Sequence, residues 1–125
     1  MKTLLTTFIF VFFSLSANAE KLPFTETLYQ EYQNNNETFL VDVFATWCPT
    51  CKKQSKIIDQ YFKEHPESNI KVLVVDYDDQ KEWVTHFRAP RQSTLLIYKG
   101  KKQLWFSVAE TNKDKIFSAL KQAEE

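Results

Sequence analysis

The sequence predicts an α/β fold in which a central mixed sheet of four strands lies between layers of helices, in the order αβαβαββα. Two apolar, β-branched runs, at residues 38–45 and 70–75, alternate with amphipathic stretches of helical period, which indicates parallel strands joined by helices. Gly100, between two further apolar runs, predicts a closing antiparallel hairpin. The chain length of 125 residues corresponds to one domain.

Residues 1–19 have the pattern of a secretory signal peptide. A short basic start precedes an apolar stretch at residues 4–15, and the small-x-small sequence that ends at Ala19 fits the cleavage rule. The alternative is an uncleaved membrane anchor, but the apolar stretch is shorter than the roughly 20 residues that span a bilayer. We therefore expect cleavage after Ala19 and a folded domain at residues 20–125.

The first half of that domain alternates helices with buried strands. Thr25 can cap a helix whose apolar side chains recur at every fourth position. The run after this helix is too apolar for a sheet with one buried face, so we expect a central strand there. The expected elements are a helix at 24–34, a strand at 38–45, a helix from 48 or 49 to about 64, and a strand at 70–75.

The second half ends in a hairpin and a helix. Gly100 lies in a lysine-rich turn between two strands, and Asn112 can cap the last helix. That helix has an apolar stripe at positions 116, 117 and 120, which we expect to face inward. The expected elements are a short helix at 80–87, strands at 94–98 and 103–108, and a helix after 112.

The chain has only two cysteines, Cys48 and Cys51, at the expected start of the second helix. A disulfide that closes so short a loop removes little entropy from the unfolded chain and is a poor structural staple, so the spacing favours a redox-active pair. A permanent structural disulfide remains an alternative in an exported protein. A structural zinc site needs four ligands, and His65 and His86 do not have zinc-ligand spacing.

Residues 39–52, 72–76 and 94–100 resemble the active-site strand, the following strand and the hairpin strand of the thioredoxin superfamily. The W-C-P-T-C-K sequence at 47–52, placed after a buried strand, is the most specific part of the resemblance. The resemblance covers residues from about 24 to 122 and implies a thioredoxin-like three-layer sandwich. It also suggests a domain that lacks the extra first strand of ordinary thioredoxins.

Three positions differ from the pattern of that superfamily. Ser93 stands where the family has a cis-proline, in the loop of Ser93 and Thr94 that frames the substrate peptide. A cis bond before a residue other than proline costs about 3 kcal/mol, so a trans or strained loop is plausible here. Val72 replaces the lysine that accompanies a buried acid, and Lys56 replaces a helix-kinking proline.

The motif itself suggests a division of roles. Cys48 at a helix N-terminus faces unpaired backbone N–H groups that stabilise a thiolate, so we expect it to be the nucleophile. Cys51, one turn later, is expected to resolve the mixed disulfide. Pro49 suits the first helical position, and Thr50 completes the dipeptide that tunes the redox potential in the family. The lysines that follow the pair are read mainly as a solvated helix face.

Two further residues are expected to support the cysteines. Asp42, in an apolar strand, is a candidate proton acceptor for Cys51 because burial would raise its pKa. The alternative is an acid that reaches water or a backbone N–H. Trp47 is expected to pack beside the disulfide and to shape the docking surface, with an ordinary core aromatic as the alternative.

The resemblance implies a thiol–disulfide oxidoreductase of an exported compartment, most simply the periplasm, that reduces disulfides in protein substrates. It implies no metal or organic cofactor, a monomer, and electrons supplied by an inner-membrane thiol–disulfide transporter. A disulfide oxidase, a non-catalytic docking module and a metal or iron–sulfur site between two chains remain alternatives. The charge balance of 16 basic and 16 acidic residues gives no indication of nucleic-acid binding.

Overall fold

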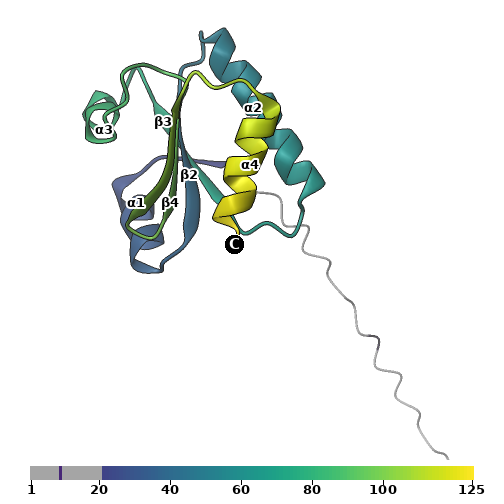
Figure 1. The fold of residues 1–125 in the computed structure, drawn as a ribbon. Coiled ribbons are helices and arrows are strands. Elements are labelled where there is room, and N and C mark those ends of the chain that lie inside the picture. The colour runs from purple at the N-terminus through teal and green to yellow at the C-terminus, as the bar shows by residue number, and fades with distance from the viewer. Residues whose placement is uncertain (1–8, 10–20) are drawn as a thin grey trace, which may run out of the picture.

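The computed structural model describes Ile9 and residues 21–125. A five-stranded sheet in the order β1-β3-β2-β4-β5 has α1 and α3 on one face and α2 and α4 on the other (Figure 1). This arrangement confirms the predicted three-layer α/β sandwich. The elements are β1 (Lys21–Pro23), α1 (Glu26–Asn34), β2 (Thr38–Phe44), α2 (Pro49–Glu64), β3 (Lys71–Asp76), α3 (Lys81–His86), β4 (Thr94–Lys99), β5 (Lys102–Val108) and α4 (Lys113–Ala123).

The prediction of four strands was wrong, because β1 adds a fifth. Lys21 lies opposite Val72, and the parallel pairing with β3 continues through Phe24, whose N–H donates to the carbonyl of Val74 at 2.8 Å. Phe24 therefore belongs to this strand extension, and the helix that was expected to begin there starts at Glu26. A three-residue strand that ends in proline has no alternation to detect, so only its partner strand defines it.

The predicted signal peptide and its cleavage site lie outside the described residues, apart from Ile9. The prediction of cleavage after Ala19 therefore stays a prediction. Among the residues that the structure does describe, no helix is long and apolar enough to cross a bilayer.

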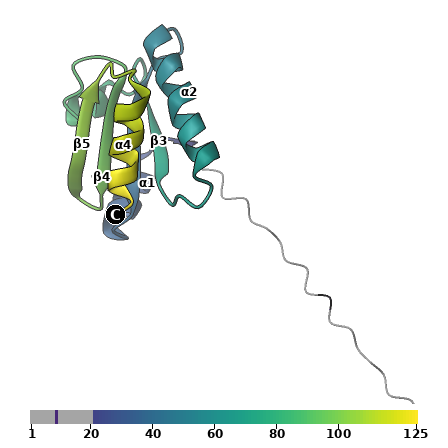
Figure 2. The ribbon, with the colours of Figure 1, turned by 45° about the vertical axis from the view of Figure 1, so that its right-hand side comes forward.

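The central strand is β2, as expected from its composition. It pairs in parallel with β3 and antiparallel with β4, and β5, the hairpin partner of β4, forms one edge of the sheet (Figure 2). Alternate residues enter the two cores, so Phe39 packs on the α1 side and Leu40 on the α2 side. The alternation also directs Asp42 to the same face as Leu40, toward α2 and α4.

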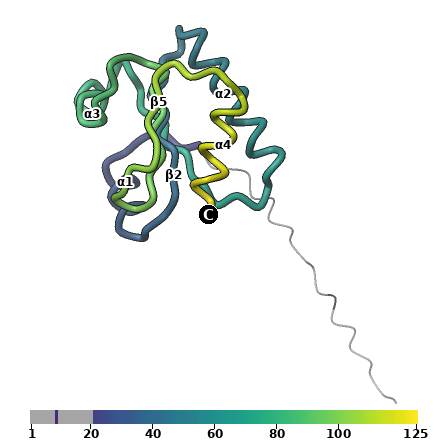
Figure 3. The backbone as a smooth tube through the Cα atoms, viewed as in Figure 1, coloured from purple at the N-terminus to yellow at the C-terminus, as the bar shows by residue number. Residues whose placement is uncertain are grey.

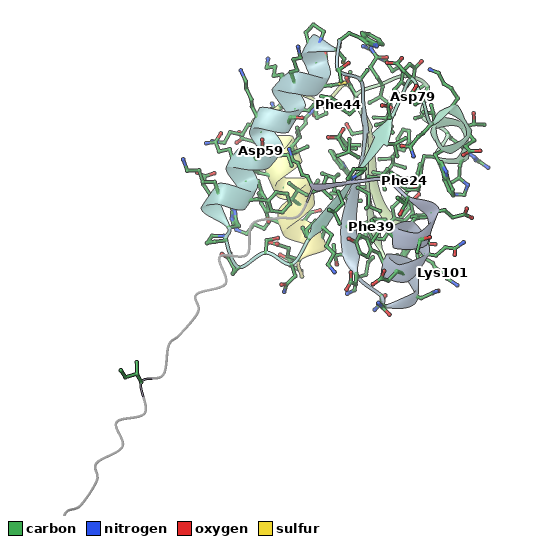
Figure 4. The ribbon with its side chains drawn as sticks, turned by 180° about the vertical axis from the view of Figure 1, so that it is seen from behind. Phe24, Phe39, Phe44, Asp59, Asp79 and Lys101 are labelled. Carbon is green, nitrogen blue, oxygen red and sulfur yellow. The ribbon has the colours of Figure 1, made fainter. Side chains whose placement is uncertain are left out.

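The core on the α1 side is rich in aromatic rings. Phe39 stacks on Tyr98 with ring centroids 5.3 Å apart, and Phe24 meets Phe87 edge-on at 5.5 Å. Phe24 and Phe39 lie beside α1 in Figure 4, whereas Asp59 marks α2 on the opposite layer. Burying these rings supplies much of the hydrophobic stabilisation that holds β2 in place.

Both predicted helix caps are confirmed. The Thr25 hydroxyl accepts from the N–H of Leu28 at 3.1 Å, and Asn112 Oδ1 accepts from the N–H of Lys115 at 3.1 Å. Each cap satisfies a backbone donor that the first turn of a helix leaves unpaired.

Candidate active site

The site lies at the end of the sheet where β2 leads into α2. Three connections meet at this end, those that precede α2, β4 and α4 (Figure 3). Gln54 of α2 connects them, because its side-chain amide donates to the carbonyls of Ser93 and Glu110. The carboxyl end of a parallel strand pair is the usual place for function in an open α/β sheet.

Cys48 is the N-cap residue of α2, and Pro49 occupies its first turn. The sulfur of Cys48 accepts a hydrogen bond from the N–H of Cys51 at 3.1 Å, so the thiol itself caps the helix. Both cysteines are in the free thiol form and both are buried, together with Ala45. Thr50 is half-buried and Pro49 is exposed.

The two thiols differ in acidity. Burial opposes ionisation of Cys48, but hydrogen bonds from the Cys51 thiol, the Ser93 hydroxyl and the Cys51 N–H outweigh it and lower the pKa of Cys48. Burial and the neighbouring Cys48 sulfur raise the pKa of Cys51. A proton lost from the pair therefore leaves the negative charge on Cys48, at the positive end of the helix dipole.

Ser93 faces both sulfurs from the loop before β4. The peptide bond before it is trans, and its backbone has a φ of +64°, in the left-handed region. Its hydroxyl oxygen lies 3.1 Å from the sulfur of Cys48 and 3.0 Å from the sulfur of Cys51. A proline at this position would offer neither a hydroxyl nor a backbone donor.

Gln54 is a site residue that the sequence reasoning missed. It is fully buried on α2, and its amide nitrogen donates to the carbonyl oxygens of Ser93 and Glu110, each at 3.0 Å. It therefore joins the loop of Ser93, which faces the cysteines, to the loop that precedes α4. The available signal was a polar residue one turn after Cys51, on the side of the helix that the pair occupies.

Asp42 is buried in β2, with a relative exposure of 2%, and its Oδ1 has no hydrogen-bond partner in the described part of the chain. Burial raises its pKa to about 7, Lys21 acts to lower it, and Asp59 acts to raise it. The alternative of an acid that reaches water or a backbone N–H does not describe this oxygen. The carboxyl group can hold or release a proton near neutral pH.

The cation near Asp42 comes from a strand that the sequence did not reveal. Val72 occupies the family's lysine position in β3, but Lys21 of β1 lies directly opposite Val72 in the sheet. Lys21 forms an ion pair with Asp59 of α2 and lies close enough to Asp42 to act on its charge. A positive charge is thus supplied from the neighbouring strand.

Trp47 lies at the surface with an exposed fraction of 55%, which excludes the ordinary core aromatic. Its indole N–H donates to a carboxylate oxygen of Asp78 at 2.8 Å, and its ring meets Tyr77 edge-on at 6.4 Å. The aromatic residues packed against the buried cysteine cluster are Phe44 and Tyr77. Trp47 is therefore displayed beside the site and held by the turn after β3.

The histidines lie elsewhere. His65 stacks on Tyr61 near the end of α2, and His86 approaches Tyr29 on the α1 side. Within residues 21–125, no three His, Cys, Asp or Glu side chains converge as a group that could hold a metal ion.

Thr94 directs its hydroxyl to the carbonyl of Arg91 at 2.6 Å.

The family model for thioredoxin matches residues 20–122. The chain is 32% identical to thioredoxin of Pyropia yezoensis over 91 residues, which are 73% of this chain and 84% of the relative. The chain belongs to the thioredoxin family. With both cysteines of the motif in place, it is a thiol–disulfide oxidoreductase.

Two other similarities extend this result. The crystal structure of Trxlp from Edwardsiella tarda matches with a TM-score of 0.76 and 30% identity, over 81% of this chain and 98% of that one. The thiol:disulfide interchange protein DsbE of Haemophilus influenzae is 29% identical over 85 residues, but this chain covers only 42% of its length. The thioredoxin fold and the position of the cysteine pair thus agree between sequence and structure.

Proposed function

We propose that this thioredoxin-family protein is an exported reductase that uses Cys48 as nucleophile and Cys51 as resolving thiol. The observation that carries the proposal is the unequal environment of the two sulfurs. Both sulfurs are buried, but Cys48 receives the helix N-terminal N–H and its pKa is lowered, whereas the pKa of Cys51 is raised. Only a thiolate attacks a disulfide, so the first attack belongs to Cys48.

The exchange takes place in two displacements. The Cys48 thiolate attacks one sulfur of a substrate disulfide, which forms a mixed disulfide and releases the other substrate sulfur as a thiolate that takes a proton from water. Cys51 then loses its proton and attacks the Cys48 sulfur. The Cys48–Cys51 bond forms, the second substrate sulfur leaves, and two electrons have passed to the substrate.

Asp42 is proposed as the acceptor of the Cys51 proton. Its carboxyl group is buried, its Oδ1 is unpartnered, and its pKa of about 7 allows it to take up a proton at neutral pH. A general base works best when its pKa is near the working pH. Lys21 and Asp59 set that pKa from opposite directions.

Trp47, Pro49 and the loop of Ser93 and Thr94 are proposed to contact the substrate. Trp47 and Pro49 flank the nucleophile on the exposed side, and the loop faces the two sulfurs from within. The proposed substrates are proteins with disulfides, and the proposed acting form is a monomer. No metal or organic cofactor is needed for the two displacements.

The proposed compartment is the periplasm. The signal-peptide pattern of residues 1–19 supports export, and the similarity to a thiol:disulfide interchange protein agrees with it. In that compartment the reduced pair must be regenerated, which we assign to an inner-membrane thiol–disulfide transporter. A disulfide oxidase uses the same two sulfurs in the opposite direction, so the reduction potential separates the two functions.

The test is the reduction potential of the Cys48–Cys51 pair, measured in residues 20–125 equilibrated with glutathione buffers. A value near that of thioredoxin, about −270 mV, supports a reductase, and a value near −120 mV shows a disulfide donor instead. A pair that never equilibrates contradicts exchange and favours a docking module. The variant Cys51→Ser should accumulate mixed disulfides with exported proteins, and the matched variant Cys48→Ser should not.

A further inference from the structure

The hydroxyl group of Ser93 lies between the two redox sulfurs, 3.1 Å from Cys48 and 3.0 Å from Cys51. A serine hydroxyl has one proton to donate and two lone pairs to accept with. It can donate to only one sulfur at a time, and it can accept from the other sulfur while that one is a thiol. When Cys48 is the thiolate, Ser93 can therefore donate its proton to Cys48 and keep its lone pairs toward the Cys51 thiol.

The backbone of Ser93 is fixed on both sides. Its N–H donates to the carbonyl of Val43 in β2 at 2.8 Å. Its carbonyl oxygen accepts from the N–H of Ala109 at 2.9 Å and from the side chain of Gln54 at 3.0 Å. These three bonds hold a left-handed conformation that residues other than glycine adopt infrequently, with Ser93 itself fully buried. With the main chain held in this way, rotation of the hydroxyl proton about the Cβ–Oγ bond can redirect the donor from one sulfur to the other without moving the backbone.

We propose that Ser93 is a catalytic hydrogen-bond donor whose hydroxyl follows the negative charge from one sulfur to the other during exchange. This proposal rests on the proposed function, because it assigns a step to the same pair of thiols. Ser93 stands where the family pattern has a proline, which has neither an N–H nor a hydroxyl to donate. The substitution thus adds a group to the site as well as removing the proline.

The hydroxyl would act at two points of the reaction. Before the first attack it donates to the Cys48 thiolate. Once the mixed disulfide forms, the Cys48 sulfur is neutral, and the hydroxyl turns to Cys51 as that thiol gives its proton to Asp42. The Cys51 thiolate then attacks Cys48, the new disulfide forms, and the electron pair of the broken bond leaves on the substrate sulfur. Consistent with both orientations, the Ser93 hydroxyl acts to lower the pKa of each cysteine.

Two variants separate the hydroxyl from the backbone. Ser93→Ala keeps the Cβ and the strained conformation, whereas Ser93→Gly relieves the strain at this φ, and both remove the hydroxyl. The pKa of Cys48 is measured from the ultraviolet absorbance of its thiolate during pH titration of the reduced protein. A hydrogen bond to a charged group is typically strong enough for its loss to reduce the thiolate-to-thiol ratio about ten-fold. Both variants should therefore titrate about one pH unit higher than the parent protein.

The second readout is the release of glutathione from the mixed disulfide at Cys48, followed in a single turnover. Loss of the donor should slow this release about ten-fold in both variants. The control Thr85→Val removes an exposed hydroxyl of α3 that donates to the carbonyl of Lys81 at 3.0 Å, and it should leave the Cys48 titration unchanged. Urea unfolding of each variant shows whether the fold is retained.

An unchanged Cys48 titration in both Ser93 variants overturns the proposal, as does a change in Ser93→Ala that Ser93→Gly lacks, since that assigns the effect to the backbone. The titration needs no substrate. A parent protein whose pair never exchanges with glutathione would contradict the proposed function, while the titration would still report on the hydroxyl. If both Ser93 variants titrate like the parent protein and the parent exchanges normally with glutathione, the role of Ser93 is contradicted and the proposed function is not.

Discussion

Replacing Asp42 with asparagine removes a carboxyl group that the fold buries at a cost. The difference between its pKa of about 7 and the ordinary 3.8 corresponds to about 4 kcal/mol at roughly 1.4 kcal/mol per pKa unit. Because the folded protein holds the proton and the unfolded chain releases it, unfolding is favoured progressively as the pH rises from about 4 to about 7. Above that range the cost is complete, and at pH 4 or below it is absent.

Asp42→Asn should therefore change the dependence of stability on pH. Relative to the parent protein, its free energy of unfolding should rise by about 4 kcal/mol between pH 4 and pH 8. The new amide brings its own donors into a buried site, which adds a constant offset at every pH. The informative quantity is the slope against pH and not the stability at one pH.

The measurement is urea unfolding at pH 4, 6 and 8, followed by tryptophan fluorescence with the cysteines kept reduced. Asp79→Asn is the control, because it removes one exposed carboxylate at the turn after β3 with the same change in charge (Figure 4). A stability difference for Asp42→Asn that stays constant between pH 4 and pH 8 would refute the reasoning from burial.

Three further predictions concern residues around the site. Lys21→Met removes the cation that lowers the pKa of the buried carboxyl, so the upper end of the pH range over which stability declines should move upward, and an unchanged upper end would contradict the assignment. Gln54→Leu removes the side-chain donor to the Ser93 carbonyl, and urea unfolding should show that the free energy of unfolding falls by about 1–3 kcal/mol. The control Gln60→Leu, at an exposed position of the same helix, should change it little. Gly100→Ala places a Cβ 2.6 Å from the side-chain oxygen of Asn36 at a φ of +57°. Thermal unfolding should therefore show that the free energy of unfolding falls by about 1–3 kcal/mol, and an unchanged stability would mean that the turn relaxes freely.

The elements that the sequence predicted are those whose signals are local. The apolar run of β2, the caps Thr25 and Asn112, and the cysteine pair at the start of α2 each follow from residues within a few positions of one another. The observed boundaries of these elements differ from the predicted ones by two residues at most. Short-range patterns of this kind determine secondary structure because the responsible hydrogen bonds and apolar faces repeat within a turn or a strand.

Other features depended on contacts between distant segments. Strand β1 exists through its pairing with β3, and that pairing places Lys21 near a carboxyl group whose usual partner position holds Val72. The sequence showed that Ser93 departs from the family pattern, but it did not show that the hydroxyl reaches both sulfurs. Gln54 gave a weaker signal still, because its partners lie in two loops far along the chain.

The sequence by itself therefore determined the fold class, the central strand and the position of the two thiols at a helix N-terminus. The tertiary structure decided the fifth strand, the burial of the Asp42 carboxyl with an unpartnered Oδ1, and the trans, left-handed backbone that presents the Ser93 hydroxyl to both sulfurs. The physical reason is that pKa values and strained conformations are set by burial and by hydrogen bonds from residues remote in sequence. Those interactions form only when β2, α2 and the loop before β4 come together.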